Sequence, residues 1–435
     1  MITKETKENA MFTAFDRDNN YNNVKAEELL LQDLPNDILF TIFKHLNSGP
    51  DFVKLSINHP KFKRVIEEMM DHSDFEDFPI HWIDHCSVAP SGRSYSQFHI
   101  GYIATKPFNF PGQKVFPLDA YAVKLSWRLD GAHCNFLMLS QVKYVDISAS
   151  CSVTDSDLVH LKNAHTLFAG SCDNLTNISG LRGGKIKKLS LHYCHNLSDV
   201  SVLSTLTELK YLCLWGSNEV TDVSALVHVE ELDLGHTTIS DISGLRGSKI
   251  KNLNLSRSTI SDVSILSTFT ELKCLSLWGC ENITDISMLG HIEKLEKLDV
   301  SYTKITNIMG LRGSKIKILS LSDCKNLGDI SILSTLSELK YLNLANTNVS
   351  DLSMVRHVEE LILDHTPISD ISDLEGSKIK KLSLNMCQNL SDVSILLTLT
   401  ELNELNLCGC EKITDESFLI VTVICALGKV KVIRK

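Results

Sequence analysis

The chain has 435 residues, a formal net charge of −10 and an isoelectric point near 5.9. This acidic balance excludes a protein that binds nucleic acid mainly through non-specific phosphate contacts. The first ten residues hold no apolar run of the kind that a secretory signal requires, and the longest apolar stretch, Phe418–Leu427, is too short to cross a bilayer. The composition therefore favours a chain that associates with neither membranes nor nucleic acid.

Helical spacing of apolar residues marks a first structured segment within residues 29–70, after residues 1–28, which are expected to be disordered. Pro35 suits a helix start, and aliphatic residues recur at helical spacing as far as Leu46. Gly49-Pro50 interrupts the pattern, and apolar residues resume at Phe52 and again at Phe62. The segment is predicted to be a small bundle of three helices.

This segment resembles the F-box, a motif that opens with Leu-Pro and an acidic residue and continues with aliphatic residues, Ile-Phe and Leu. The Trp that the family carries near the end of the motif is absent, and Phe62 stands nearest to its place. The resemblance implies docking on a Skp-type adaptor, which would join the chain to a cullin. The implied adaptor-binding residues are Leu34, Pro35, Ile38, Leu39, Ile42, Phe43 and Leu46. The alternative is that these side chains serve only as the core of the bundle.

Two further segments are expected to cap the two ends of the region formed by residues 122–414. Residues 71–121 combine frequent prolines with frequent aromatic residues, which argues against a merely flexible linker and predicts an irregular, packed connector. Residues 415–435 are predicted to form a C-terminal cap, with a helix over Asp415–Leu427 and a strand over Lys429–Ile433.

Residues 122–414 repeat a Leu-x-Leu motif about 13 times. The first Leu of the clear copies stands at positions 189, 212, 232, 253, 275, 298, 319, 342, 361, 382 and 405, at spacings of 19 to 23 residues. In an extended chain the two Leu of each copy point the same way, so stacked copies share one continuous core. This pattern resembles the leucine-rich repeat. It implies an α/β solenoid, a horseshoe with a parallel sheet on its concave side and short 3₁₀ or irregular segments on its convex side, preceded by the F-box-like α-helical bundle.

The sequence also shows a longer period, which spans three repeats. The segments that begin Gly247-Ser248, Gly313-Ser314 and Gly376-Ser377 resemble one another closely, and the leading leucines 189, 253, 319 and 382 are 64, 66 and 63 residues apart. The array is therefore interpreted as copies of a block of three repeats.

Two polar rows accompany the leucines. A Cys, Thr or Ser stands five residues after the first Leu, as at Cys194 and Cys280, and is expected to turn inward and bond to the backbone of neighbouring turns. An Asp later in the repeat, as at Asp199 and Asp241, is expected to cap the first turn of the return segment. Calcium binding by the Asp row is the alternative, although a calcium site needs several converging ligands.

Large or charged residues beside the strand leucines are candidates for a partner-binding patch, because exposed aromatic and Arg side chains commonly anchor interfaces. The predicted partner-binding residues are Tyr193, Tyr211, Trp215, His236, Arg257, Trp278, Asp299 and Tyr302. Trp215 and Trp278 hold equivalent places three repeats apart, and Asp233 and Asp299 are expected on neighbouring strands. Duplication of a block without any use for the Trp is the alternative.

Chemistry-bearing motifs are weak. The runs HWIDHC (residues 81–86) and HYCH (residues 192–195) lack the paired spacings of metal sites, and no nucleotide-binding or hydrolase motif is present. We expect no enzyme, no metal and no cofactor. Six of the thirteen cysteines hold the inward position of the repeat, which argues against a disulfide framework and favours the cytoplasm or nucleus.

The resemblance implies a substrate-recognition subunit of a Skp–cullin–F-box-type ubiquitin ligase. The F-box would dock the adaptor, and the concave repeat face would bind the protein to be ubiquitinated, whose identity the sequence does not reveal. The rival hypothesis is a leucine-rich-repeat scaffold without a ubiquitin link, since the repeats also resemble those of protozoan and bacterial internalin-type arrays. Repeats alone do not separate the two, because a fold does not determine a function.

Overall fold

The structure is a computed structural model that describes residues 100–104, 120–125, 140, 142–150, 153–414, 419–421 and 430–433. The predicted disordered tail (1–28) and the F-box-like segment (29–70), with its adaptor-binding residues, lie outside the described residues. Within the described part, no helix has the length and apolar character needed to span a bilayer.

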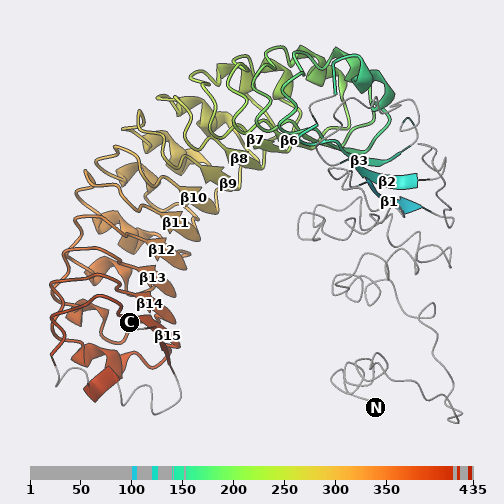
Figure 1. The fold of residues 1–435 in the computed structure, drawn as a ribbon. Coiled ribbons are helices and arrows are strands. Elements are labelled where there is room, and N and C mark those ends of the chain that lie inside the picture. Colours follow the sequence, from blue (N-terminus) through green and yellow to red (C-terminus); the bar gives the residue numbers. More distant parts are fainter. Residues whose placement is uncertain are drawn as a thin grey trace, which may run out of the picture.

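One sheet of 16 strands in sequence order lines the inner side of an arc (Figure 1). From β2 onward all neighbouring strands are parallel, with the residues of successive Leu-x-Leu motifs paired in register. The strands are β1 (Ile100–Ala104), β2 (Ala120–Leu125), β3 (Tyr144–Asp146), β4 (Thr166–Phe168), β5 (Lys188–Ser190), β6 (Tyr211–Cys213), β7 (Glu231–Asp233), β8 (Asn252–Asn254), β9 (Cys274–Ser276), β10 (Lys297–Asp299), β11 (Ile318–Ser320), β12 (Tyr341–Asn343), β13 (Glu360–Ile362), β14 (Lys381–Ser383), β15 (Glu404–Asn406) and β16 (Lys431–Ile433).

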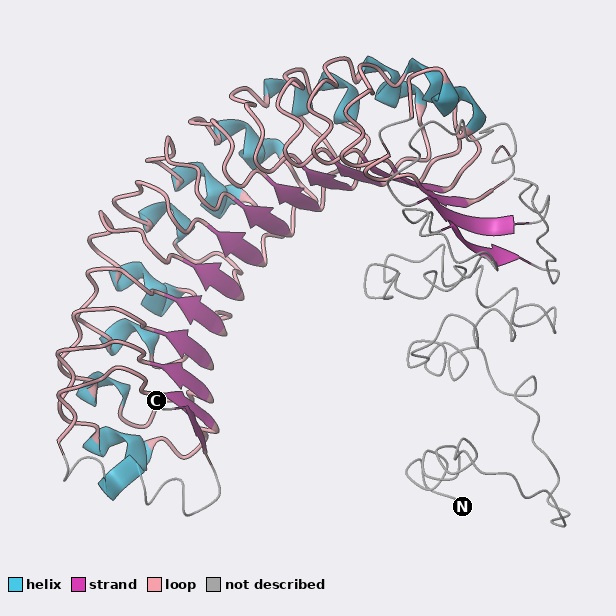
Figure 2. Ribbon diagram, viewed as in Figure 1, coloured by secondary structure: helices cyan, strands magenta, loops and turns pink. Residues whose placement is uncertain are grey.

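Short 3₁₀ helices form the outer side of the arc, as the repeat length predicts, because about twenty residues leave no room for a long helix after the strand (Figure 2). They are η6 (Asp157–His160), η7 (Ser179–Leu181), η8 (Ser201–Thr205), η9 (Ser224–Leu226), η10 (Ser243–Leu245), η11 (Ser264–Thr268), η12 (Ser287–His291), η13 (Met309–Leu311), η14 (Ser331–Thr335), η15 (Ser353–Val355), η16 (Ser372–Leu374) and η17 (Ser394–Thr398). The predicted parallel concave sheet and 3₁₀ convex side are thus confirmed for the described residues.

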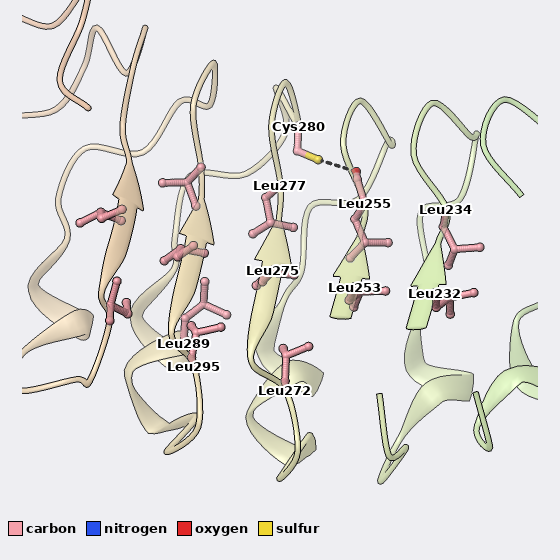
Figure 3. Close-up of a cluster of buried hydrophobic side chains, with 14 of the residues drawn as sticks. Leu232, Leu234, Leu253, Leu255, Leu272, Leu275, Leu277, Cys280, Leu289 and Leu295 are labelled. Carbon is pink, nitrogen blue, oxygen red and sulfur yellow. Dashed lines mark hydrogen bonds between the residues drawn. The ribbon is translucent and has the colours of Figure 1, made fainter. Parts of the chain in front are cut away.

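The leucines of each motif point into the space between the sheet and the 3₁₀ helices (Figure 3). Leu253 and Leu255 are 2% and 0% exposed, and their equivalents in the other repeats stack on them to form one continuous core. Cys280, in the predicted inward row, is buried and its thiol donates to the Leu255 carbonyl of the preceding repeat at 3.0 Å. The row is therefore structural, since it satisfies backbone carbonyls between repeats.

The Asp row also has its predicted capping role. Asp241 Oδ1 accepts the backbone N–H of Ser243, the first residue of η10, at 2.7 Å, and Asp199 Oδ1 accepts that of Ser201, the first residue of η8, at 2.9 Å. These bonds satisfy N–H groups that a helix start leaves without an intrahelical partner. Asp415, which the sequence places in the same row, lies outside the described residues.

The N-terminal end of the sheet differs from the expected irregular connector over residues 71–121. Within that range, β1 forms an antiparallel pair with β2, which crosses the end of the range and opens the parallel sheet. An added antiparallel strand covers the edge of the first repeat with main-chain hydrogen bonds, as the end of a solenoid requires. At the other end, β16 lies within the predicted strand and pairs with β15, and residues 419–421 are helical.

A charged edge runs along the chain just before each strand. The residue two positions before the first Leu follows a Lys–Lys–Glu order that repeats with the three-repeat block. Glu230 contacts both Lys210 and Lys251, and Glu359 contacts both Lys340 and Lys380. Each Glu thus lies between two Lys from the flanking repeats, so every Lys of the edge from Lys210 to Lys380 has a Glu in one neighbouring repeat.

Candidate functional site

The concave groove is a hollow of about 810 Å³ on the inner face of strands β6–β12. Each strand buries its central Leu and turns the residues on either side toward this face, as the two-residue period of a strand dictates. The lining side chains are mostly short and polar. They include Glu231, Asp233, Asn252, Asn254, Cys274, Ser276, Trp278, Lys297, Asp299, Ser301, Ile318, Ser320, Ser322, Tyr341 and Asn343, with Tyr211 at one end.

Three of the predicted partner-binding residues, Tyr211, Trp278 and Asp299, line this groove. Asp299 Oδ1 accepts the backbone N–H of Ser301 at 3.0 Å, which fixes the carboxylate at the end of its strand. Asn254 and Asn343 make the same bond in their repeats, to Ser256 and Ala345. Asp or Asn at this position therefore has a structural role that the sequence did not reveal, and it holds a polar group at a set place in the groove.

The expectation that Asp233 and Asp299 lie on neighbouring strands is wrong. Asp233 ends β7 and Asp299 ends β10, and two strands, β8 and β9, lie between them in the sheet. The two carboxylates hold the same register position, so they face the same groove at a separation set by three strand spacings, ~14 Å.

Four other predicted residues lie in the turn that follows a strand, three residues after the end of that strand. Tyr193, His236, Arg257 and Tyr302 have φ of 55°, 56°, 54° and 56°, the left-handed region that non-glycine residues rarely adopt. Tyr193 and Tyr302 remain 41% and 47% exposed. With Trp215 and Trp278 these four residues form what we call the rim, a line of large side chains beside the groove.

Trp215 bridges the rim residues of the repeats on either side of it. Its Nε1 donates to the Tyr193 hydroxyl at 3.1 Å, and its ring lies 6.0 Å from the His236 ring, tilted by 35°. The ring also covers Gly235, where an added Cβ would lie 2.3 Å from it. Three successive repeats thereby hold one half-buried indole in place.

Trp278 holds the equivalent position one block later. The Arg257 guanidinium lies 4.5 Å from the centre of the Trp278 ring, a cation–π contact, and the Tyr302 ring packs edge-on at 5.3 Å. The two blocks therefore carry triads at equivalent positions, Tyr193–Trp215–His236 and Arg257–Trp278–Tyr302, with different contacts to the Trp. Only the central Trp of each is the same residue type.

A glycine follows each rim Trp and makes room for the preceding repeat. Gly216 and Gly279 both have φ of 70°, in the left-handed position that carries a side chain in the flanking repeats. A Cβ on Gly216 would lie 2.5 Å from the Tyr193 ring, and one on Gly279 would lie 3.0 Å from Arg257 Cγ. The Gly after each Trp therefore leaves space for the side chain of the preceding repeat, Tyr193 or Arg257, to contact that Trp.

The rim continues past its predicted end. The Tyr302 hydroxyl bonds to the Asp323 carboxylate, and this hydrogen bond raises the pKa of Tyr302 above its ordinary value. Asn346 Nδ2 donates to the other side of the same residue, Asp323 Oδ2, at 3.2 Å. Asp323 and Asn346 also have φ of 57° and 56°. Neither was predicted, because only large or aromatic residues were sought, although their position four residues after the first Leu marks them.

The HYCH run shows no arrangement of a metal site. His192 Nδ1 lies 2.9 Å from Ser190 Oγ, and burial lowers the pKa of His192, while Cys194 is buried in the inward row. Among the described residues, no group of three or more His, Cys, Asp or Glu side chains is placed to hold a metal ion. The other run, residues 81–86, lies outside the described residues.

The comparisons with known proteins concern the repeat array. Residues 248–365 match the family model for the BspA type leucine rich repeat region. No curated protein matches the chain. Solved structures with a similar arrangement include an internalin (inlF) from Listeria monocytogenes, with 23% identity, a TM-score of 0.49 and coverage of 68% of this chain and 85% of that one.

Two further structures have a similar arrangement. One is the leucine-rich-repeat protein LIC12759 of Leptospira interrogans, with 16% identity, a TM-score of 0.49, and 68% and 85% of the two chains covered. The other is the functional domain of InlJ from Listeria monocytogenes, with 18% identity, a TM-score of 0.46, and 62% and 65% covered. The family match over residues 248–365 and the observed stack of strands and 3₁₀ helices support a leucine-rich-repeat solenoid for the described array.

Proposed function

We propose that the chain is a non-enzymatic scaffold that binds another protein across the concave groove and the rim. The observation that carries this proposal is the pair of Trp-centred triads, because they hold large aromatic and Arg side chains at fixed positions beside a groove of short polar residues. Rigid aromatic and Arg side chains surrounded by polar groups are the usual anchors of protein interfaces. Repeat scaffolds of this shape offer an extended concave surface for such contacts.

Replacing both indoles tests this function. We expect the full chain with Trp215→Ala and Trp278→Ala to lose the proteins that cross-link to the wild-type chain in its own cells, because truncating an interface anchor costs about 2 kcal/mol or more. The matched control is Met309→Ala with Leu397→Ala. These two apolar side chains are 46% and 54% exposed on the convex 3₁₀ helices, and their loss should leave the partners unchanged. An unaltered set of partners for the Trp variant would refute the proposal.

A second candidate, the ubiquitin-ligase receptor, rests on a sequence feature. The F-box-like residues from Leu34 to Leu46 stand ahead of an array that offers a separate binding surface, which is the two-ended arrangement that such a receptor needs. In this case the partners are a Skp-type adaptor and, through it, a cullin, and the chain acts in the cytoplasm or nucleus.

The full chain with Leu34→Ala, Pro35→Ala and Ile42→Ala separates the two candidates. Co-purification of a Skp-type adaptor and a cullin with the wild-type chain, lost in this variant while the groove-dependent partners remain, supports the receptor. If neither subunit co-purifies with the wild-type chain, the scaffold without a ubiquitin link stands.

A further inference from the structure

Carboxylates stand at one register position of the concave groove on β7 and β10, and on either side of that position on β13. The in-register row runs from Asp233 on β7 through Asn254 and Ser276 to Asp299 on β10. Three strands further along, Ile362 on β13 holds the same register position. Glu360 stands two residues before Ile362 and Asp364 two residues after it, and both lie on the same face as Ile362. The interval equals the three-repeat block, so the acidic sites share the period of the array.

Backbone hydrogen bonds hold these carboxylates in place. Asp233 Oδ1 accepts the N–H of Gly235 at 2.9 Å, as Asp299 Oδ1 accepts that of Ser301. Asp364 Oδ1 accepts the N–H of Asn385 in the next repeat at 3.0 Å. A charge that is already ordered loses less entropy when it binds an oppositely charged group.

The charge of this face is unbalanced. At the concave strand positions of β7–β13 the acidic side chains are Glu231, Asp233, Asp299, Glu360 and Asp364, and the basic one is Lys297. The Lys–Lys–Glu edge beside these strands and Arg257 of the rim add further basic side chains, but acidic ones remain in excess. Within the described part of the chain, Glu360 pairs with Lys381 at 3.0 Å, whereas Asp299 and Asp364 take part in no salt bridge. Burial, followed by the charges of Glu360 and Asp299, raises the pKa of Tyr341, which lines the groove between these acids. A concave wall with an excess of acidic groups attracts basic ones.

We propose that the concave face of β7–β13 docks an extended protein segment that carries a Lys or Arg at every fourth residue. Three strand spacings span ~14 Å, and four extended residues span ~13–14 Å, so side chains i and i+4 of such a segment reach Asp233 and Asp299. A third basic residue at i+8 lies between Glu360 and Asp364. Positions i, i+4 and i+8 project to the same side of an extended chain, which is the side that faces the groove.

The aromatic residues of the groove suit the same partner. Trp278 stands between Asp233 and Asp299 in the order of the strands, and Tyr341 stands between Asp299 and Asp364. The aliphatic stems of Lys and Arg pack on such rings while their charged ends reach the carboxylates, and the rings attract the cation itself. This inference rests on the proposed function, for which it names the class of partner.

The test uses two fluorescent nine-residue peptides of Lys, Ser and Thr with the same composition. One carries Lys at positions 1, 5 and 9, and the other at positions 2, 5 and 8, so that successive Lys face opposite sides. With the full chain at low ionic strength, fluorescence anisotropy should show about tenfold tighter binding of the first peptide, the gain expected from three exposed ion pairs, and added salt should remove the difference.

Charge-neutralised variants complete the design. The chain with Asp233→Asn, Asp299→Asn and Asp364→Asn should bind the first peptide about tenfold more weakly, because the three ion pairs are lost. Asn keeps the Oδ1 acceptor of each Asp, and an Asn already occupies the Asp233 and Asp299 position at Asn254. The matched control removes the same charge outside the groove, with Asp241→Asn, Asp262→Asn and Asp329→Asn, and should bind as the wild type does.

Equal binding of the two peptides, no binding of either, or an unweakened triple-Asn groove variant would overturn the inference. The proposed function is judged separately by the Trp215→Ala and Trp278→Ala chain. If that chain loses its cross-linked partners while the peptides fail, only the basic character of the partner is refuted. Self-association of the chain in the absence of peptide would identify a second copy as the occupant instead.

Discussion

At the scale of single residues, the Cys members of the inward row couple a repeat to the one before it. The Cys members donate to a carbonyl of the preceding repeat, as Cys324 does to Val300 O at 3.2 Å, whereas Thr303 donates to Val300 O within its own repeat at 2.7 Å. Two donors from successive repeats thus share one carbonyl. Cys and Thr are alternative ways to satisfy the same buried acceptor, which is why the row tolerates exchange between them.

Burial of this row predicts the reactivity of its thiols. Burial raises the pKa of Cys172 to about 12 and that of Cys194 to about 11, so almost none of either is thiolate at pH 8. Cys408, on the concave side, is half-buried and reachable. We expect iodoacetamide to label Cys408 in the native chain and to label Cys172 and Cys194 only after unfolding, as read by peptide mass spectrometry. Labelling of all three at one rate would contradict the buried row.

At the scale of one element, most of the 3₁₀ helices start with a hydrogen bond to an exposed Asp. The hydrogen bond from the Ser N–H two residues on lowers the pKa of Asp199, Asp222, Asp241, Asp262 and Asp329 below their ordinary value of 3.8. In two repeats Asn177 and Asn307 make the same bond. The cap therefore requires an acceptor oxygen, and the carboxylate adds a dependence on pH.

The sign of that dependence follows from the lowered pKa. Each cap stabilises the fold fully above the unfolded pKa of 3.8, and this stability is lost as the pH falls through the lower folded value. We expect the midpoint of urea unfolding to fall as the pH drops below about 4, and to fall less steeply in the chain with Asp241→Asn, Asp262→Asn and Asp329→Asn. The same slope in both chains would refute the role of the carboxylates.

At the scale of the whole molecule, the core is a single stack in which a repeat contacts only its neighbours (Figure 1). Each central strand is hydrogen-bonded to a strand on both sides, and its leucines pack against those of both neighbouring repeats. The last strand of the sheet, β16, is hydrogen-bonded to a strand on one side. Stability in such an array is a sum of repeat and interface contributions, so it is highest away from the ends.

Hydrogen exchange should show this gradient. We expect the slowest amide exchange in β8–β12 and faster exchange toward β16. Leu298→Ala, at a side chain that is 1% exposed, should cost about 2–5 kcal/mol and speed exchange most in the repeats on either side of it. Lys297→Ala, on the same strand but exposed, serves as the control. Uniform exchange along the array would show that the repeats unfold as one unit.

The core could be predicted from the sequence because periodicity determines it. The Leu-x-Leu strands, the inward Cys and the capping Asp each follow from a spacing that repeats many times, and within the described array they lie where the spacing predicts. The backbone conformation of the rim could not be predicted, because Tyr and Arg do not favour the left-handed region. Tyr193 and Arg257 adopt it because the stacking of the repeats determines the turn after each strand. Contacts such as Arg257 with Trp278 join residues of different repeats, which a motif within one repeat does not contain.

The Lys–Lys–Glu edge limits how such an array can change its length. Removal of a whole block by recombination, joining the repeat of Glu230 to that of Lys317, would leave every Glu between two Lys. Loss of the single repeat that carries Glu296 would set Lys273 against Lys317 and Lys340, a run of like charges on adjacent strands that repel one another. A change of length in steps of three strands, ~14 Å of concave surface at a time, therefore keeps the charge pairing of the edge intact.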